Sequence, residues 1–199
     1  MTRDRDVQAF DHRSAGYETG YLGQLHAEIV TRTADLALAR CPDPARVLDV
    51  GCGTGLMLRE LAGRLPGATE LTGVDPAAGM IEQARARSAD PRLTFVEGVA
   101  ERLPFGDAAF DLVITTTSFD HWADQLAGLA ECRRVLAPGG LFVLTDQCST
   151  WLLPTLAGVR RDRARTPLRA TRLLAAAGFR SMRWHRLYAV IIRTVTASA

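Results

Sequence analysis

The sequence contains no lysine, so all 24 of its basic residues are arginine. Because alanine is also abundant, we attribute this to a genomic bias towards G+C-rich codons. There are 22 acidic residues, and the resulting net charge of +2 predicts no general affinity for nucleic acid. Positive charge is in local excess only from Arg160 to Arg172. The simpler interpretation of this stretch is a solvated helix face and linker; the alternative is a site for an anionic substrate or an RNA backbone.

Other absences exclude further classes of protein. No apolar run reaches the roughly 18 residues that span a bilayer, and the charged opening, residues 1–6, is unlike a secretory signal. The cysteines show neither a C-x-x-C pair nor the spacing of a zinc site. We therefore expect a cytoplasmic protein with free thiols, no membrane contact and no metal. The cysteines are Cys41, Cys52, Cys132 and Cys148.

The length of 199 residues, 47% of them apolar, fits one domain with a substantial core. Apolar runs alternate with amphipathic stretches, which is typical of a parallel sheet flanked by helices. Thr166 and Pro167 mark the start of the last helix, and Gly178 marks its end. The expected strands are 46–50, 70–75, 93–97, 110–116, 140–146, 180–187 and 189–195. The expected helices are 22–40, 56–64, 77–88, 123–136 and 167–177.

A glycine-rich loop follows the first expected strand. Gly51, Gly53 and Gly55 stand at alternate positions, so a ligand can approach the backbone there without meeting a Cβ atom. The spacing G-x-G-x-G differs from a dinucleotide fingerprint and, without a lysine, from a phosphate loop. Asp49 precedes the first glycine by two residues. Its carboxylate repels a pyrophosphate and favours a cationic or ammonium-bearing ligand.

The segment 49–55, Asp-Val-Gly-Cys-Gly-Thr-Gly, resembles motif I of the class I S-adenosylmethionine (SAM) dependent methyltransferases. The resemblance continues in order through 70–75, 97–105, 110–116 and 133–141, and it extends from about Phe10 to Val195, nearly the whole chain. The opening from Phe10 to Glu18 is most similar to the broad small-molecule branch, of the type 11 kind. The resemblance implies an α/β, Rossmann-like, doubly wound and mostly parallel seven-stranded sheet with an antiparallel last strand and helices on both faces.

The resemblance also implies a SAM site. Asp75 ends the second strand, where an acid accepts both ribose hydroxyls, and Thr116 corresponds to a contact of the methionine part. Val99 stands where the family often has an aspartate for the adenine amino group, so backbone groups near Ala100 or the carboxylate of Glu101 are the alternatives. Tyr17 either closes over the sulfonium or packs the N-terminal segment. The expected cofactor residues are Tyr17, Asp49, Gly51, Cys52, Gly53, Gly55, Asp75, Pro76, Met80, Val99, Ala100, Glu101 and Thr116.

Methyl transfer from a sulfonium requires alignment and exclusion of water more than it requires a catalytic triad. A base is needed only when the nucleophile holds its proton tightly. We prefer His121 as that base, because histidine titrates near neutrality. The alternative is that Asp120 or His121 caps a helix beginning at Ala123. Trp122, His12 and His26 are interpreted as packing or surface residues.

We expect one methyltransferase domain over 1–199. It comprises an N-terminal lid and helix (1–45), a cofactor-binding core (46–147), a substrate-side insertion (148–165) and a closing helix with two strands (166–199). The expected acceptor is a small organic molecule with an oxygen, nitrogen or carbon nucleophile. No Asn-Pro-Pro-Tyr run, which family members use to hold a planar amino nitrogen, follows the fourth strand, and this argues against methylation of DNA adenine or of glutamine. From the net charge we expect no nucleic-acid partner.

Two other functions stay open. One is a SAM-binding protein without catalysis, or one that depends on a partner subunit. The other is a nicotinamide-dependent oxidoreductase, which the glycine spacing and Asp49 disfavour. The sequence leaves the oligomeric state open between monomer and homodimer.

Overall fold

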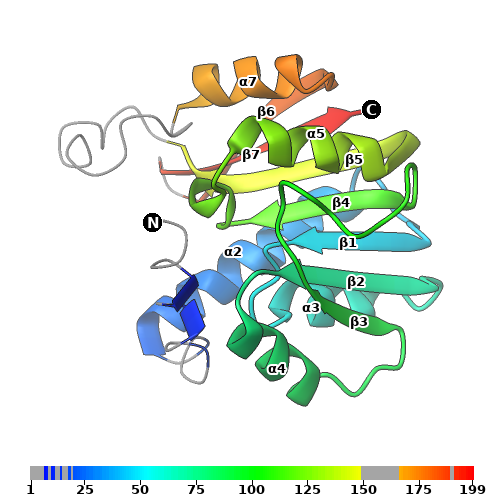
Figure 1. Ribbon diagram of the computed structural model, residues 1–199, viewed down its shortest axis with the longest axis vertical. Helices are drawn as coiled ribbons and strands as arrows, with labels where there is room; N and C mark the ends of the chain where they lie inside the picture. Colours follow the sequence, from blue (N-terminus) through cyan, green and yellow to red (C-terminus); the bar gives the residue numbers. More distant parts are fainter. Residues whose placement is uncertain are drawn as a thin grey trace.

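The computed structural model describes residues 7–8, 10–11, 14, 18, 20–148, 166–188 and 191–199. Its seven-stranded sheet has the order β3-β2-β1-β4-β5-β7-β6 (Figure 1). Strands β1 to β5 pair in parallel, and β7 runs antiparallel to both β5 and β6. The predicted fold is therefore confirmed. The strands are β1 (Arg46–Val50), β2 (Glu70–Asp75), β3 (Leu93–Glu97), β4 (Phe110–Thr116), β5 (Leu136–Gln147), β6 (Arg180–Tyr188) and β7 (Ile192–Ser198).

Helices cover both faces of the sheet (Figure 1). Buried apolar residues of α2, α3 and α4 form one core cluster with the sheet, and those of α5 and α7 form a second on the other face. The helices are α2 (Gly20–Leu38), α3 (Leu56–Arg64), α4 (Ala78–Ala86), the 3-10 turn η2 (Phe119–His121), α5 (Gln125–Val135) and α7 (Pro167–Ala176). As predicted, the Thr166 hydroxyl caps α7 by accepting from the Arg169 N–H at 3.3 Å, and Pro167 is its first residue.

Some boundaries differ from prediction. β5 begins at Leu136 because that residue pairs with Phe110 before a register shift, and β7 spans 192–198 rather than 189–195. Helix α5 begins at Gln125, and its cap is Asp124, whose Oδ1 accepts from the N–H groups of Leu126 and Ala127, each at 3.0 Å. The interpretation of Asp120 or His121 as the cap of this helix is therefore wrong.

The parallel strands place chemically active residues at one edge of the sheet. β1, β2 and β4 all end there, and they deliver Asp49, Asp75 and Thr116 to neighbouring positions. Residues of the N-terminal segment also reach this edge, since Asp11 and Glu18 bond to α4 and to the glycine loop. The edge where an open α/β sheet binds ligands is thus the edge on which the predicted residues gather.

Candidate cofactor and acceptor site

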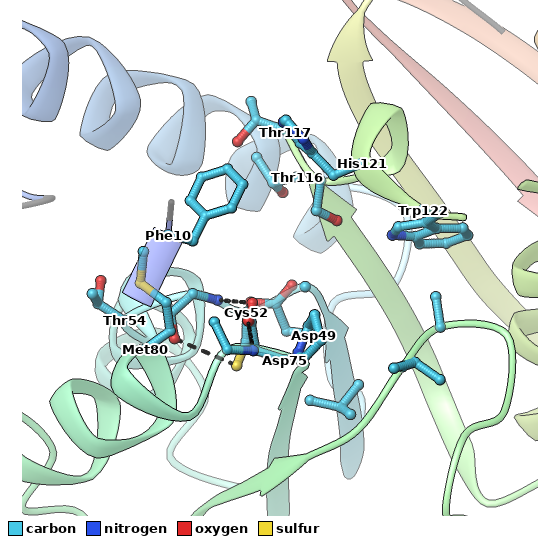
Figure 2. A pocket seen from close by; sticks show the side chains of 18 of the residues that line it. Phe10, Asp49, Cys52, Thr54, Asp75, Met80, Thr116, Thr117, His121 and Trp122 are labelled. Carbon is cyan, nitrogen blue, oxygen red and sulfur yellow. Dashed lines mark hydrogen bonds between the residues drawn. The ribbon is translucent and has the colours of Figure 1, made fainter. Parts of the chain in front are cut away.

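A cleft opens at the carboxyl edge of the sheet. Its empty volume, including the part open to solvent, is about 1010 Å³, a size sufficient for a small-molecule site. Figure 2 shows Asp49, Cys52 and Asp75 on one side and Thr116, Thr117 and His121 on the other, with Phe10 beside the opening between them. The predicted residues that line this cleft are Asp49, Gly51, Cys52, Gly53, Asp75, Pro76, Met80, Val99, Ala100, Glu101, Thr116 and His121.

Among the described residues, the predicted Gly55 does not line the cleft. A Cβ at Gly55 would lie 2.7 Å from the Phe95 ring, so this glycine allows α3 to pack closely on β3. Tyr17 lies outside the described residues, as do His12 and the predicted insertion apart from Cys148. The structure therefore does not place the residue predicted to close over the sulfonium.

The glycine loop turns sharply beneath the cleft. The N–H groups of Gly51 and Cys52 both donate to the Val74 carbonyl, at 2.8 and 3.1 Å. Gly53 has φ +52°, a conformation that side chains disfavour, yet a Cβ there would meet no atom within 4 Å. The space in front of Gly53 is thus open to a ligand.

Asp75 fixes this loop. Its Oδ2 accepts from the Gly53 N–H, and its Oδ1 accepts from the Ala77 N–H, both at 2.9 Å. Burial raises the pKa of Asp75, although these two bonds act in the opposite direction. Each carboxylate oxygen can accept more than one hydrogen bond. Asp75 can therefore hold the loop and still accept from a ligand hydroxyl in the cleft.

Asp49 and Thr116 each carry a polar atom with unused bonding capacity. Asp49 is 2% exposed and Thr116 is 7% exposed, and within the described residues Asp49 Oδ1 and Thr116 Oγ1 have no hydrogen-bond partner. Burial and the nearby charge of Asp75 raise the pKa of Asp49 to about 8. Buried polar atoms are nearly always paired in folded proteins. These two atoms therefore mark positions where donors of a ligand fit.

Glu101 is partly engaged within the protein. Its Oε1 accepts from the N–H groups of Ala123 and Asp124, at 2.6 and 3.1 Å, and so holds the segment that leads into α5. The Val99 carbonyl accepts from the Arg102 N–H at 3.1 Å. The backbone at Val99 and Ala100 forms this wall of the cleft together with the Glu101 side chain.

The opposite end of the cleft contains two histidines. His121 belongs to η2, and its ring meets the Phe10 ring edge-on, with centroids 5.0 Å apart. His26 of α2 also lines the cleft, and its Nδ1 lies 3.4 Å from the Thr117 hydroxyl. Burial lowers the pKa of His26, while Glu18 acts in the opposite direction. The interpretation of His26 as a packing residue is therefore incomplete, and no sequence motif in α2 marks it.

Thr117, at this end of the site, has an unusual backbone conformation. Its φ of +54° is rare for a β-branched residue. The Thr117 N–H donates to the Thr145 carbonyl at 2.8 Å, which anchors the turn to β5. Such strain persists only where surrounding structure enforces it, and it is concentrated at functional sites.

The turn that carries His121 is held from both neighbouring strands. The Ser118 hydroxyl donates to the Val50 carbonyl at 2.9 Å, and Asp146 Oδ2 accepts from the Asp120 N–H at 3.3 Å. Burial raises the pKa of Asp146 to about 7. Trp122 packs edge-on against Phe119, as predicted, and also lines the cleft.

The N-terminal segment is attached to the glycine-loop side of the cleft through Glu18. Glu18 Oε1 accepts from the Thr54 hydroxyl, from Arg59 at 2.7 Å and from Arg87 at 3.0 Å. Burial alone would raise the pKa of Glu18, but these bonds and the two arginine charges bring it below its usual value. Asp11 Oδ1 accepts from the Gly79 N–H at 2.9 Å. Sequence analysis named the opening that contains Glu18 but missed its partners, because contacts over such separations leave no local pattern.

The described residues contain no group of three or more His, Cys, Asp or Glu side chains arranged to hold a metal ion. None of the helices within these ranges is long and apolar enough to cross a bilayer.

Known proteins resemble this chain in both sequence and fold. Residues 47–140 match a family described as "Methyltransferase domain". A malonyl-[acyl-carrier protein] O-methyltransferase of Geobacter sulfurreducens is 41% identical over 145 residues, which are 71% of this chain and 53% of that protein. A demethylmenaquinone methyltransferase of Deinococcus radiodurans is 44% identical over 117 residues, 58% of this chain and 48% of that protein. The chain thus spans about half the length of these relatives.

Solved structures share the fold at lower identity. A methyltransferase solved in complex with the Haloferax volcanii Trm112 activator superposes with a TM-score of 0.79 at 24% identity, over 96% of this chain and 97% of that one. A possible histamine N-methyltransferase of Thermotoga maritima gives 0.72 at 20% identity, over 95% and 97%. The strand order and these superpositions show a Rossmann-like fold. More narrowly, residues 47–140 are similar to methyltransferase domains, and the fold is consistent with the class I methyltransferases that the glycine-loop motif predicted.

Proposed function

We propose that this chain transfers a methyl group from SAM to an oxygen, nitrogen or carbon nucleophile of a small organic acceptor by in-line displacement. One observation carries most of the proposal: the unpartnered Asp49 Oδ1 and Thr116 Oγ1 lie at the same cleft as Asp75 and the open face of Gly53. An acidic group suits the ammonium of an amino acid, and a second acid beside a glycine loop suits a ribose. SAM contains both groups.

The residues present fit this cofactor. Asp75 would accept from the ribose hydroxyls, Asp49 from the ammonium group, and Thr116 would bond the amino-acid part. The wall at Val99, Ala100 and Glu101 would hold the adenine, and Gly53 leaves room for close approach to the backbone. The bound cofactor supplies a methyl group on a sulfonium, which is a good leaving group. The remaining work of the protein is to orient the acceptor and exclude water.

The acceptor end supports proton removal. His121 stays our preferred base, and His26 is a second imidazole at the same end of the cleft. The burial-lowered pKa of His26 keeps that ring neutral at pH 7, the form that accepts a proton. An imidazole nitrogen at this end would accept the proton of the nucleophile as the nucleophile takes the methyl group, and the S–C bond electrons would leave with the thioether product.

The side chains around the histidines favour a planar, largely apolar acceptor. Phe10 and Trp122 provide aromatic surface there, and Val30 adds aliphatic surface. Aromatic rings pack well on such side chains in stacked or edge-on arrangements. Within the range of small organic acceptors, we therefore favour a hydroxylated aromatic compound.

A methyl-transfer assay tests the proposal. The purified chain is incubated with SAM labelled with tritium in its methyl group and with 2-prenyl-1,4-naphthoquinol as the aromatic probe. Malonyl-acyl carrier protein serves as a second, carboxylate-bearing acceptor. We expect label to enter the naphthoquinol. Transfer to the malonyl group instead would overturn the aromatic preference, and SAM binding without transfer to any of a broad acceptor panel would favour the alternative of a non-catalytic or partner-dependent SAM-binding protein.

A further inference from the structure

Positive charge is concentrated at one end of the chain. The last acidic residue is Asp162, and eight arginines follow it without a compensating carboxylate. The preceding 162 residues contain the other 16 arginines together with all 22 acidic residues. The net charge of +2 is therefore the sum of a strongly basic segment after Asp162 and an acidic region before it. The eight arginines are Arg163, Arg165, Arg169, Arg172, Arg180, Arg183, Arg186 and Arg193.

The fold places the described part of this segment at one end of the sheet. Figure 1 shows α7, β6 and β7 together at the end opposite to β3 and α4. Arg172 of α7 and Arg180, Arg183 and Arg186 of β6 are exposed. Within the described residues none of these four joins an ion pair, whereas Arg59 and Arg134 bond to carboxylates. Burial lowers the pKa of His185, and the charges of Arg40 and Arg183 add to this effect.

β6 is also an edge strand. It pairs with β7, and no other described strand pairs with its outer side. Register shifts on either side leave residues 183–186 as the regular part of this strand, and beyond them the Leu187 carbonyl accepts from Arg32 of α2 at 3.0 Å. The outward backbone N–H and C=O groups within 183–186 resemble those that other proteins use to bind an extended peptide as an additional strand. An occupant of this edge would thus gain main-chain hydrogen bonds as well as contacts with the arginines.

The arginines flank the edge on both faces. Trp184 Nε1 donates to the Thr171 hydroxyl at 2.9 Å, so Trp184 faces α7, and His185 Nε2 lies 3.1 Å from Thr196 Oγ1 on the opposite face. Side chains alternate along a strand. Arg186 therefore lies on the face of Trp184, and Arg183 lies on the face of His185.

Charged residues on an edge strand have a simpler role, which is to prevent aggregation. Charges of either sign serve that purpose, and they are needed only on the strand. Here one sign extends over β6 and onto α7. A polypeptide with carboxylates at successive positions would meet arginines on both faces, because its own side chains alternate as well. A nucleic acid would match the charge but not the strand edge.

We propose that the β6 edge docks an extended acidic segment of a partner protein. The segment adds a strand alongside β6 and places its carboxylates against Arg183 on one face and Arg186 on the other. Arg172 and Arg180 extend the same basic surface. This docking is independent of the proposed methyl transfer, since the surface excludes the residues of the cleft.

Fluorescence anisotropy with a labelled acetyl-(Glu-Glu-Val-Val)3-amide peptide, which presents carboxylates on both faces of an extended strand, tests the proposal. We expect the protein to bind this peptide at low salt, less tightly at physiological salt, and not to bind the matched (Gln-Gln-Val-Val)3 peptide. The double variant Arg183→Glu, Arg186→Glu should weaken binding at least about tenfold. Arg183→Glu alone should also weaken it, whereas Arg102→Glu, an equal charge reversal at an exposed residue far along the sheet, should change it less than about twofold. Hydrogen exchange of β6 amides should slow when the peptide is bound.

Each contrary result is decisive. The proposal fails if the acidic peptide does not bind, if the matched glutamine peptide binds equally well, or if Arg102→Glu weakens binding as much as Arg183→Glu. Tighter binding of a uridine decamer, with the same dependence on Arg183, would assign the surface to nucleic acid instead. S-adenosylhomocysteine binding by each variant reports whether the fold is intact, so loss of peptide binding and failure of the methyltransferase proposal are distinguishable.

Discussion

The two ends of the cleft are built differently. The end that we propose holds the cofactor comes mainly from a short stretch of chain, in which β1, the glycine loop and the end of β2 deliver Asp49, Gly53 and Asp75. The end that we propose holds the acceptor combines residues far apart in sequence, including His26 of α2 and His121 of η2. The first end depends on local backbone geometry, which a motif can encode. The second depends on how distant elements pack, which no local motif encodes.

The largest effect is expected from removal of the proposed base, which should lower the rate of methyl transfer without changing cofactor binding. His121→Ala should lower the rate of methyl transfer by about 100-fold, a typical contribution of a general base. Binding of S-adenosylhomocysteine should stay within about twofold, because the ring faces the acceptor end. His26→Asn is the matched comparison, measured with the same acceptor. If His121→Ala leaves the rate unchanged and His26→Asn lowers it, the role of base passes to His26.

Changes at the cofactor end should act on binding instead. Asp75→Ala and Gly53→Val should each weaken SAM binding at least tenfold, or about 1.4 kcal/mol. The first removes the acceptor that holds the Gly53 N–H, and the second puts a side chain into the open space at a left-handed position. Gly67→Val is a control, since a Cβ there also meets no atom within 4 Å and its backbone is not left-handed. Unchanged affinity in both variants with an intact fold would show that the cofactor lies elsewhere.

The contrast between local geometry and distant packing also explains how much of each end could be predicted from the sequence. The spacing along the chain predicted Asp75 and the glycine loop as cofactor residues, and Asp75, Gly51 and Gly53 line the cleft. Thr117 was not, since its positive φ arises from an anchor to Thr145 on another strand. Asp124 as the cap of α5 was also missed, because Asp120 and His121 offered plausible caps a few residues earlier. The arrangement of strands was predicted well, since each alternation of apolar run and helix is long and regular.

The pH dependence of binding probes Asp49. Its pKa of about 8 leaves it mostly protonated at pH 7 in the empty site. A bound ammonium group favours the carboxylate, so S-adenosylhomocysteine should release a proton on binding and bind more tightly as the pH rises from about 6 to about 8. Calorimetry in buffers of different ionisation enthalpy measures this release. Asp49→Asn should abolish both effects.

The pH should affect the free energy of unfolding in the opposite direction through Asp49: stability should fall as the pH rises. Because the folded-state pKa of Asp49 is raised, its neutral form stabilises the fold at low pH, and that contribution is lost as the pH rises through about 8. Asp49→Asn should therefore be more stable than the parent protein above that pH, in unfolding by denaturant. A variant that is less stable at every pH would contradict the assignment of a destabilising buried charge.

A smaller effect is expected from relief of backbone strain. Thr117→Gly should raise the free energy of unfolding by about 1 kcal/mol, because glycine adopts a positive φ without a steric cost. It also removes the hydroxyl beside His26, so methyl transfer should slow while cofactor affinity stays constant. Thr117→Ser keeps the hydroxyl and should keep the rate. Equal rates in all three proteins would leave the Thr117 hydroxyl without a role in the proposed acceptor site.

The central claim is that the cleft holds SAM, and calorimetric titration with S-adenosylhomocysteine, with NAD titrated in parallel, tests it most directly. The account predicts micromolar binding of S-adenosylhomocysteine and no measurable binding of NAD. Binding of NAD alone, or of neither compound, would contradict it.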